Sequence, residues 1–124
     1  MGLDMYAFAT EEKPAKAVDF PETDPAKTEK LHYWRKHPNL HGWMQKLYDE
    51  KGGENEEFNL AAVILDSDDL DELEAAIVDQ RLPETSGFFF GGSDGSERDD
   101  DLAFIGKARA AIASGKTVFY MAWW

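Results

Sequence analysis

The closing segment of the chain, residues 118–124 (VFYMAWW), constrains the fold more than any other, because all of its side chains are apolar or aromatic. In a β-strand, successive side chains point to opposite faces, so both faces of this strand would be apolar. At least one of them must be covered by helices, by a partner chain or by a bound ligand. The segment therefore predicts a sheet with a covered face, and a homodimer contact is one candidate for covering the other.

Four segments have the pattern of strands. Residues 3–8 alternate Leu3, Met5 and Ala7 with polar or aromatic neighbours, which is typical of a strand with a buried face. Residues 58–65 (FNLAAVIL) form an apolar run that contains β-branched residues, which indicates a central strand. We expect strands at residues 3–8, 58–65, 88–90 and 118–124.

Four further segments have the pattern of helices. Asp24-Pro25 is a strong helix start, because Asp caps well and proline suits the first helical position. Pro38 would stop that helix. Asn39 can cap a second helix, whose apolar residues recur at the spacing of one buried stripe, and Ser67 can cap a third. We expect helices at residues 24–36, 39–51, 67–82 and 99–113.

These elements predict an α+β fold in a single compact domain that spans residues 1–124. The sheet should be mostly antiparallel, with about four strands and with helices mainly on one face. We expect the first and last strands to pair, since terminal strands are often held in this way. Residues 9–23 should form a surface connection that Val18 and Phe20 pin down. The chain contains no cysteine, so its stability must come from packing.

The composition of the chain is strongly acidic. Its 124 residues include 25 Asp and Glu but only 13 Lys and Arg, a formal net charge of −12. This argues against direct nucleic-acid binding, because phosphate backbones are held by clustered Lys and Arg. An acidic surface either keeps a protein soluble or imitates nucleic acid toward a basic protein, and the composition leaves both open. With no apolar run of 18 residues and an acid at Asp4, we expect a cytoplasmic protein without membrane contact.

Residues 31–48 (LHYWRKHPNLHGWMQKLY), the acid-free stretch, are an exception to this acidity. They contain all three histidines together with Arg35, Lys36 and Lys46. If the stretch is two helices joined at residues 37–39, their polar faces meet around one hollow. Guanidinium and imidazole donors beside indole rings suit a small anion with an aromatic part, such as a nucleotide. A second segment, the FFF run at residues 88–90 between two glycines, contributes Phe89. The expected ligand contacts are therefore His32, Trp34, Arg35, Lys36, His37, His41, Tyr48 and Phe89.

Two other interpretations of these residues remain open. His37 and His41 are candidate catalytic groups because histidine titrates near neutral pH, and Arg35 could stabilise developing negative charge. Alternatively, the tryptophans belong to the core and the cations balance nearby acids. A metal site is not expected, because Pro38 breaks the geometry that would aim both histidines at one ion. No cofactor is predicted, since no cofactor-binding motif is present.

Four runs of the sequence, MGLDMYAF, LHYWRKHPNLHGWM, TSGFFFGGSDGSE and FYMAWW, together resemble a small family of uncharacterised bacterial and phage proteins. The similarity covers nearly the whole chain. Some members carry an automatic label of phosphoglycerate kinase, but 124 residues cannot build the two-domain clamp of that enzyme. The resemblance brings no catalytic residues, and it implies an intracellular protein that travels on mobile elements.

These observations lead to one preferred function and two alternatives. The preferred function is a non-enzymatic binding module for a small anionic ligand, phosphate-like or nucleotide-like, or for a partner protein. The first alternative is a small phosphoester hydrolase or transferase that uses His37, His41 and Arg35. The second is an acidic mimic of nucleic acid that inhibits a basic protein.

Overall fold

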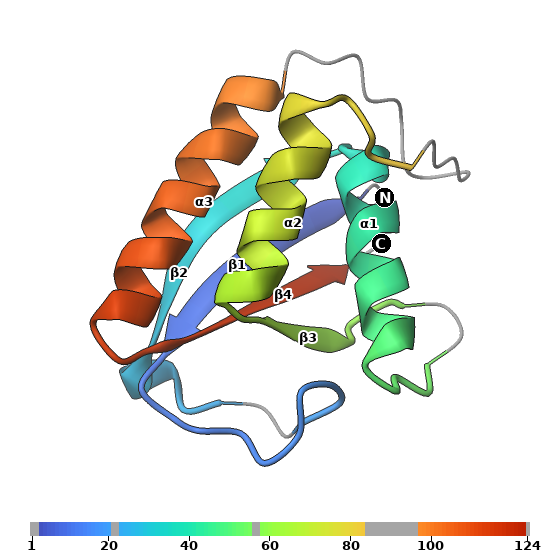
Figure 1. Cartoon of the computed structure of the whole chain (residues 1–124). Coiled ribbons are helices and arrows are strands. Elements are labelled where there is room, and N and C mark those ends of the chain that lie inside the picture. The colour runs from blue at the N-terminus through green and yellow to red at the C-terminus, as the bar shows by residue number, and fades with distance from the viewer. Residues whose placement is uncertain (1–2, 21–22, 56–57, 84–96, 124) are drawn as a thin grey trace.

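In the residues that the computed structural model describes, three α-helices lie over one face of a four-stranded antiparallel sheet (Figure 1). The structure describes residues 3–20, 23–55, 58–83 and 97–123. The predicted α+β fold, with its antiparallel sheet and helices on one face, is confirmed. None of the described helices is long and apolar enough to cross a lipid bilayer. The elements are β1 (Asp4–Thr10), the 3-10 helix η1 (Pro25–Lys27), β2 (Thr28–Arg35), α1 (Pro38–Glu50), β3 (Ala62–Leu65), α2 (Ser67–Val78), α3 (Arg98–Ala113) and β4 (Thr117–Trp123).

The two central strands of the sheet come from opposite ends of the chain. In the strand order β2-β1-β4-β3, β1 pairs with β4 from Asp4 opposite Trp123 to Thr10 opposite Thr117. This confirms the predicted pairing of the first and last strands. Several buried residues on the helix side are alanines, which let the helices approach the sheet closely. The buried side chains on that side are Met5, Ala7, Ala9, Val118, Tyr120 and Ala122.

Each helix buries one apolar stripe against this side of the sheet. The stripes repeat at three- and four-residue spacing, as an amphipathic helix requires. The stripe predicted for residues 39–51 is confirmed in position, although Trp43 is only half-buried; in α3, Leu102 and Ile112 are half-buried at the margin of the stripe. The fully buried members are Leu40, Met44, Leu70, Leu73, Phe104, Ile105 and Ala108.

The predicted helix at residues 24–36 is wrong. Asp24 does cap a turn, since its side chain accepts a hydrogen bond from the Ala26 N–H at 2.9 Å, but η1 ends at Lys27 and β2 follows at once. Pairing with β1 satisfies the backbone groups along one edge of residues 28–35. A local cap can start a helical turn, whereas pairing with a distant strand decides how the chain continues.

The strand predicted at residues 58–65 is confirmed only in its second half. β3 covers Ala62–Leu65, because Phe58 and Leu60 have positive φ values of 46° and 59°, outside the strand region. β3 also lies at one end of the strand order, so the prediction of a central strand is wrong. Its apolar character reflects the segments that cover it and not a central position.

The connection between β1 and η1 closes the outer edge of β3. Exposed strand edges invite unwanted pairing, and native proteins usually cover them. The hydroxyl of Tyr48 in α1 holds the connection in place by donating to the Asp19 carboxylate at 2.5 Å. The backbone contacts of this edge are Ile64 N–H to Ala17 O (2.8 Å), Asp19 N–H to Ala62 O (3.3 Å) and a bridge between Val18 and Val63.

Two helix starts differ by one or two residues from the prediction. α1 begins at Pro38 with His37 as its N-cap, so this proline opens the helix. α2 is capped by Asp66, whose side chain accepts from the Asp69 N–H at 2.9 Å, while the Asp69 side chain accepts from the Asp66 N–H at 3.0 Å. This reciprocal capping box satisfies two backbone donors at once. The strand predicted at residues 88–90 lies outside the described residues.

Gly53 allows a test of the packing at the end of α1. A Cβ on Gly53 would overlap the fully buried ring of Tyr48, whereas a Cβ on Gly106 in α3 would meet no atom within 4 Å. We expect Gly53→Ala to lower the free energy of unfolding by about 1–3 kcal/mol, as overpacking does. Gly106→Ala should raise it by about 0.5–1 kcal/mol, because alanine is the better helix former. Urea unfolding measures both, and equal stability of the two variants would contradict this packing.

Candidate functional site

The acid-free stretch spans the second half of β2, the turn that follows and most of α1, and its side chains do not share one hollow. In β2, His32 and Trp34 point toward α3, whereas Tyr33 and Arg35 point to the helix-free face of the sheet. The predicted pair of helices facing each other across a turn is wrong, because the first of them is a strand. The period of two in a strand divides the side chains between opposite sides of the sheet.

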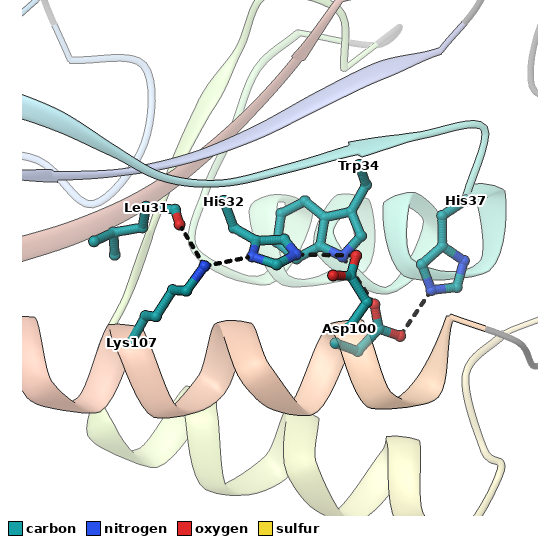
Figure 2. Close-up of polar contacts among 7 residues, drawn as sticks. Leu31, His32, Trp34, His37, Asp100 and Lys107 are labelled. Carbon is teal, nitrogen blue, oxygen red and sulfur yellow. Dashed lines mark hydrogen bonds and ion pairs between the residues drawn. The ribbon is translucent and has the colours of Figure 1, made fainter.

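Asp101 of α3 is a buried carboxylate that forms hydrogen bonds with two side chains of the acid-free stretch. Its Oδ1 accepts from the Trp34 Nε1–H at 2.9 Å, and its Oδ2 lies 2.8 Å from Nε2 of His37. Asp101 is only 2% exposed and His37 only 3%. Figure 2 shows that Trp34 and His37 both approach α3 from the sheet side. One carboxylate therefore joins β2 and the start of α1 to α3.

His32 lies between two charged residues of α3 (Figure 2). Its Nε2 is 3.0 Å from Oδ2 of Asp100, and its Nδ1 is 3.4 Å from Nζ of Lys107. An ammonium group can only donate, so Nδ1 is the acceptor in the contact with Lys107. The ring also packs against Phe104 of α3 with a centroid distance of 6.0 Å. His32 thus links β2 to α3 by both polar and ring contacts.

His41 is fully buried between α1 and the sheet. Its Nδ1 lies 2.8 Å from the hydroxyl oxygen of Tyr120 in β4, and its ring stacks on Phe58 with centroids 5.0 Å apart. Burial lowers the pKa of His41 to about 4 and raises the pKa of Tyr120 well above its usual value. At neutral pH the imidazole is therefore uncharged and the hydroxyl keeps its proton.

The remaining predicted contact residues lie apart from one another. Nε of Arg35 is 3.6 Å from Oδ1 of Asp4 on the helix-free face. Lys36 is exposed and has a φ of 55° just after β2. Tyr48 is fully buried, and burial together with its hydrogen bond to Asp19 raises its pKa. Phe89 lies outside the described residues.

The acid-free stretch is thus largely engaged by the protein's own groups. His32, His37 and Arg35 each approach a carboxylate. The candidate catalytic residues His37 and His41 are 3% and 0% exposed, so both rings are shielded from solvent, and a catalytic role for them stays a prediction. Within the described ranges, no group of three His, Asp or Glu side chains could hold a metal ion.

The helix-free face of the sheet carries a continuous line of aromatic rings, the aromatic row. Adjacent ring centroids are between 5.2 and 6.0 Å apart, within the range of favourable ring contacts. Its members come from β2, β1, β4 and the connection after β1. In spatial order they are Tyr33, Tyr6, Phe8, Phe119 and Phe20.

A hollow of about 630 Å³, the sheet hollow, opens at the Phe20 end of the aromatic row. Its described lining is mainly apolar and contains one cation, Lys30, but no carboxylate. Nζ of Lys30 lies 5.8 Å from the ring centroid of Tyr33. The apolar lining includes Phe8, Phe119 and Met121 from the sheet and Phe20 and Leu60 from flanking segments.

Apolar and aromatic residues in the first and last strands already indicated this face in the sequence, outside the acid-free stretch. Residues 118–124 are apolar on both faces, and Tyr6 and Phe8 are aromatic on the second face of residues 3–8. Once β1 and β4 pair, Phe8 lies opposite Phe119 and Tyr6 opposite Met121. The two second faces therefore join into one aromatic surface.

Comparisons of the chain with models of protein families, with curated proteins and with solved structures each found no match. The function must therefore be inferred from the side chains and surfaces described above.

The buried imidazole of His41 should make stability depend on pH. Its pKa of about 4 in the folded state is below the ordinary value of 6.5, so the stabilisation is complete above pH 6.5 and is lost as the pH falls toward 4. Compared with His41→Gln, the wild type should lose about 2 kcal/mol of unfolding free energy between pH 7 and pH 5, from the 1.36 kcal/mol that each pKa unit represents. Urea unfolding at both pH values measures this difference, and parallel losses in the two proteins would disprove it.

Asp101 and Asp100 are neighbours in the first turn of α3 and form a matched pair for mutation. Asp101→Ala would leave the buried donors of Trp34 and His37 without their acceptor, so we expect a loss of roughly 2–4 kcal/mol in unfolding free energy. Asp100→Ala removes a carboxylate that is 54% exposed, and the loss should stay below about 1 kcal/mol. Thermal or urea unfolding compares them, and similar losses would contradict the role of Asp101.

Proposed function

We propose that the protein is a non-enzymatic binding module that holds a small anionic ligand with an aromatic part in the sheet hollow. The observation that carries this proposal is an aromatic lining around a single cation, Lys30, with no described carboxylate. In a chain with 25 carboxylates, such a lining is a place where an anion avoids close like charges. The ligand class is the one expected for the acid-free stretch, at a different place on the molecule.

Lys30 supports binding of the anionic part of the ligand. Its side chain is exposed and forms no ion pair with a described carboxylate. An ammonium group beside apolar surface can donate charge-assisted hydrogen bonds to a phosphate or carboxylate. The hydroxyl oxygens of Thr23 and Thr28, 2.9 Å apart, add polar groups to the same lining.

Three phenylalanines support binding of the aromatic part. The rings of Phe8 and Phe119 are 5.2 Å apart with an interplanar angle of 29°, and Phe20 meets Phe119 edge-on at 88°. A heteroaromatic ring can stack on such surfaces without requiring a particular base. A volume of about 630 Å³ is in the range of small-molecule sites. A nucleotide combines such a ring with a phosphate.

A second hollow, between α1 and α2, is less suited to an anion. It has a volume of about 390 Å³ and is lined by Lys46 and Arg81 but also by Glu50 and Glu72. Because its charges balance, it does not select a ligand by the sign of its charge. The sheet hollow is therefore the better candidate.

Calorimetric titration with a panel of nucleoside mono-, di- and triphosphates and with inorganic phosphate tests this function. We expect at least one nucleotide to bind, and phosphate to bind more weakly because it lacks a ring. Lys30→Met should weaken nucleotide binding by about tenfold, which corresponds to the loss of one charge-assisted hydrogen bond. Raising the salt concentration should also weaken binding to the wild type, because salt screens exposed charges.

Two control variants separate the sheet hollow from other places on the molecule. Lys46→Met removes the same charge from α1, outside the sheet hollow, and should leave the affinity unchanged. Arg35→Ala removes a cation of the acid-free stretch, no residue of which lines the sheet hollow, and it should have little effect. No heat from any nucleotide, or equal losses in Lys30→Met and Lys46→Met, would rule out the proposed site.

A further inference from the structure

The outer edge of β2 is a second surface that the described chain leaves open. β2 lies at one end of the strand order and pairs with β1 alone among the described segments. The opposite edge, at β3, is closed by residues 17–19. Unpaired edges present free backbone donors and acceptors and are usually covered in native proteins. This asymmetry marks the β2 edge as a place where an extended chain can add to the sheet.

The hydrogen-bond pattern indicates which backbone groups face outward. The Lys36 N–H donates to the Leu3 carbonyl at 2.9 Å, and residues bonded to the neighbour alternate along an antiparallel strand. The N–H and C=O groups of Tyr33 and Arg35 therefore point away from β1. On the same edge, the Leu31 carbonyl lies 3.4 Å from Nζ of Lys107. The Leu31 carbonyl thus already accepts from a side chain of the protein. The N–H groups of an added peptide can donate to the outward carbonyls of Tyr33 and Arg35.

Three lysines lie on or beside this edge, while two of the acids next to it are already engaged, Asp4 by Arg35 at 3.6 Å and Asp100 by His32 at 3.0 Å. Lys30, Lys36 and Lys107 lie on or beside β2, and none forms an ion pair with a described carboxylate. Glu29, an acid within the strand, is engaged by Lys116 at 3.0 Å. In a chain of net charge −12, this local positive charge complements an acidic partner. A second copy of the chain would instead bring like charges together.

We propose that the β2 edge binds an extended acidic segment of another protein, which adds to the sheet as a fifth strand. Backbone pairing with Tyr33 and Arg35 supplies affinity, and carboxylates of the segment meet the edge lysines. The ring of Tyr33, which is 42% exposed, offers an apolar contact beside them. This interaction does not depend on a ligand in the sheet hollow.

Peptide binding to the full-length protein tests this proposal. The probe is a fluorescent, terminally blocked peptide of alternating Glu and Val, measured by anisotropy. Two further versions are N-methylated at the odd or at the even positions, and a fourth has Lys in place of Glu. In an antiparallel pairing only one set of amides faces β2. We therefore expect one methylated peptide to bind about tenfold more weakly than the other, and the Lys peptide not to bind.

Protein variants distinguish this edge from the sheet hollow. Lys36→Glu should weaken binding of the acidic peptide by about tenfold, whereas Lys46→Glu on α1 should not. Because Lys36 does not line the sheet hollow, Lys36→Glu should leave nucleotide affinity unchanged, so the two proposals can fail separately. Absence of acidic-peptide binding, or equal affinity for both methylated peptides, would overturn the fifth strand. The edge lysines would then serve only to prevent strand pairing.

Discussion

The antiparallel pairing of β1 with β4 is the contact on which the rest of this structure depends. Because the two strands pair in register, Ala7 and Tyr120 face the helices together, and Phe8 and Phe119 face away from them together. The first pair joins the buried core, where small alanine side chains leave room for the helices. The second pair becomes part of the aromatic row. A single register thus creates both the covered and the helix-free face of the sheet.

The acid-free stretch gains its carboxylates from other parts of the chain. Asp4 comes from β1, and Asp100 and Asp101 come from the first turn of α3. The interpretation in which a tryptophan joins the core and the cations balance nearby acids agrees with this geometry, at least for Trp34, which is 3% exposed. Local composition alone could not separate this interpretation from a ligand site, because the partners lie more than 60 residues away along the chain for both His37 and Trp34.

The two proposed binding surfaces share a physical basis, which is local positive charge on a negatively charged protein. A net charge of −12 repels distant anions, but at physiological ionic strength charges are screened beyond roughly 8 Å. Over shorter distances, the nearest side chains decide which ligand is attracted. Lys30 at the sheet hollow and Lys36 at the β2 edge therefore matter more than the total charge. The ring of Tyr33 beside Lys30 supplies an apolar contact that charge alone lacks.

Much of the fold could be predicted because its patterns are local. The stripes of α1 and α2 and the alternation of β1 are periodic enough to indicate both the element and its buried face. The ends of β3 and the nature of residues 28–35 could not be predicted in this way. An N-cap at Asp24 favours a helix, and only pairing with β1 makes the following segment a strand.

The sequence by itself determined that this chain is an acidic α+β domain with an apolar closing strand and one stretch free of acids. The tertiary structure decided which carboxylates pair with the charged side chains of that stretch and which strand lies at an uncovered edge of the described sheet. The physical reason is that helix and strand periodicity act within about ten residues, whereas strand order and carboxylate partners join residues far apart in the chain. Asp101 meets His37 and Trp34 only after β2 and α3 pack together. Phe8 meets Phe119 only once the two ends of the chain share a sheet.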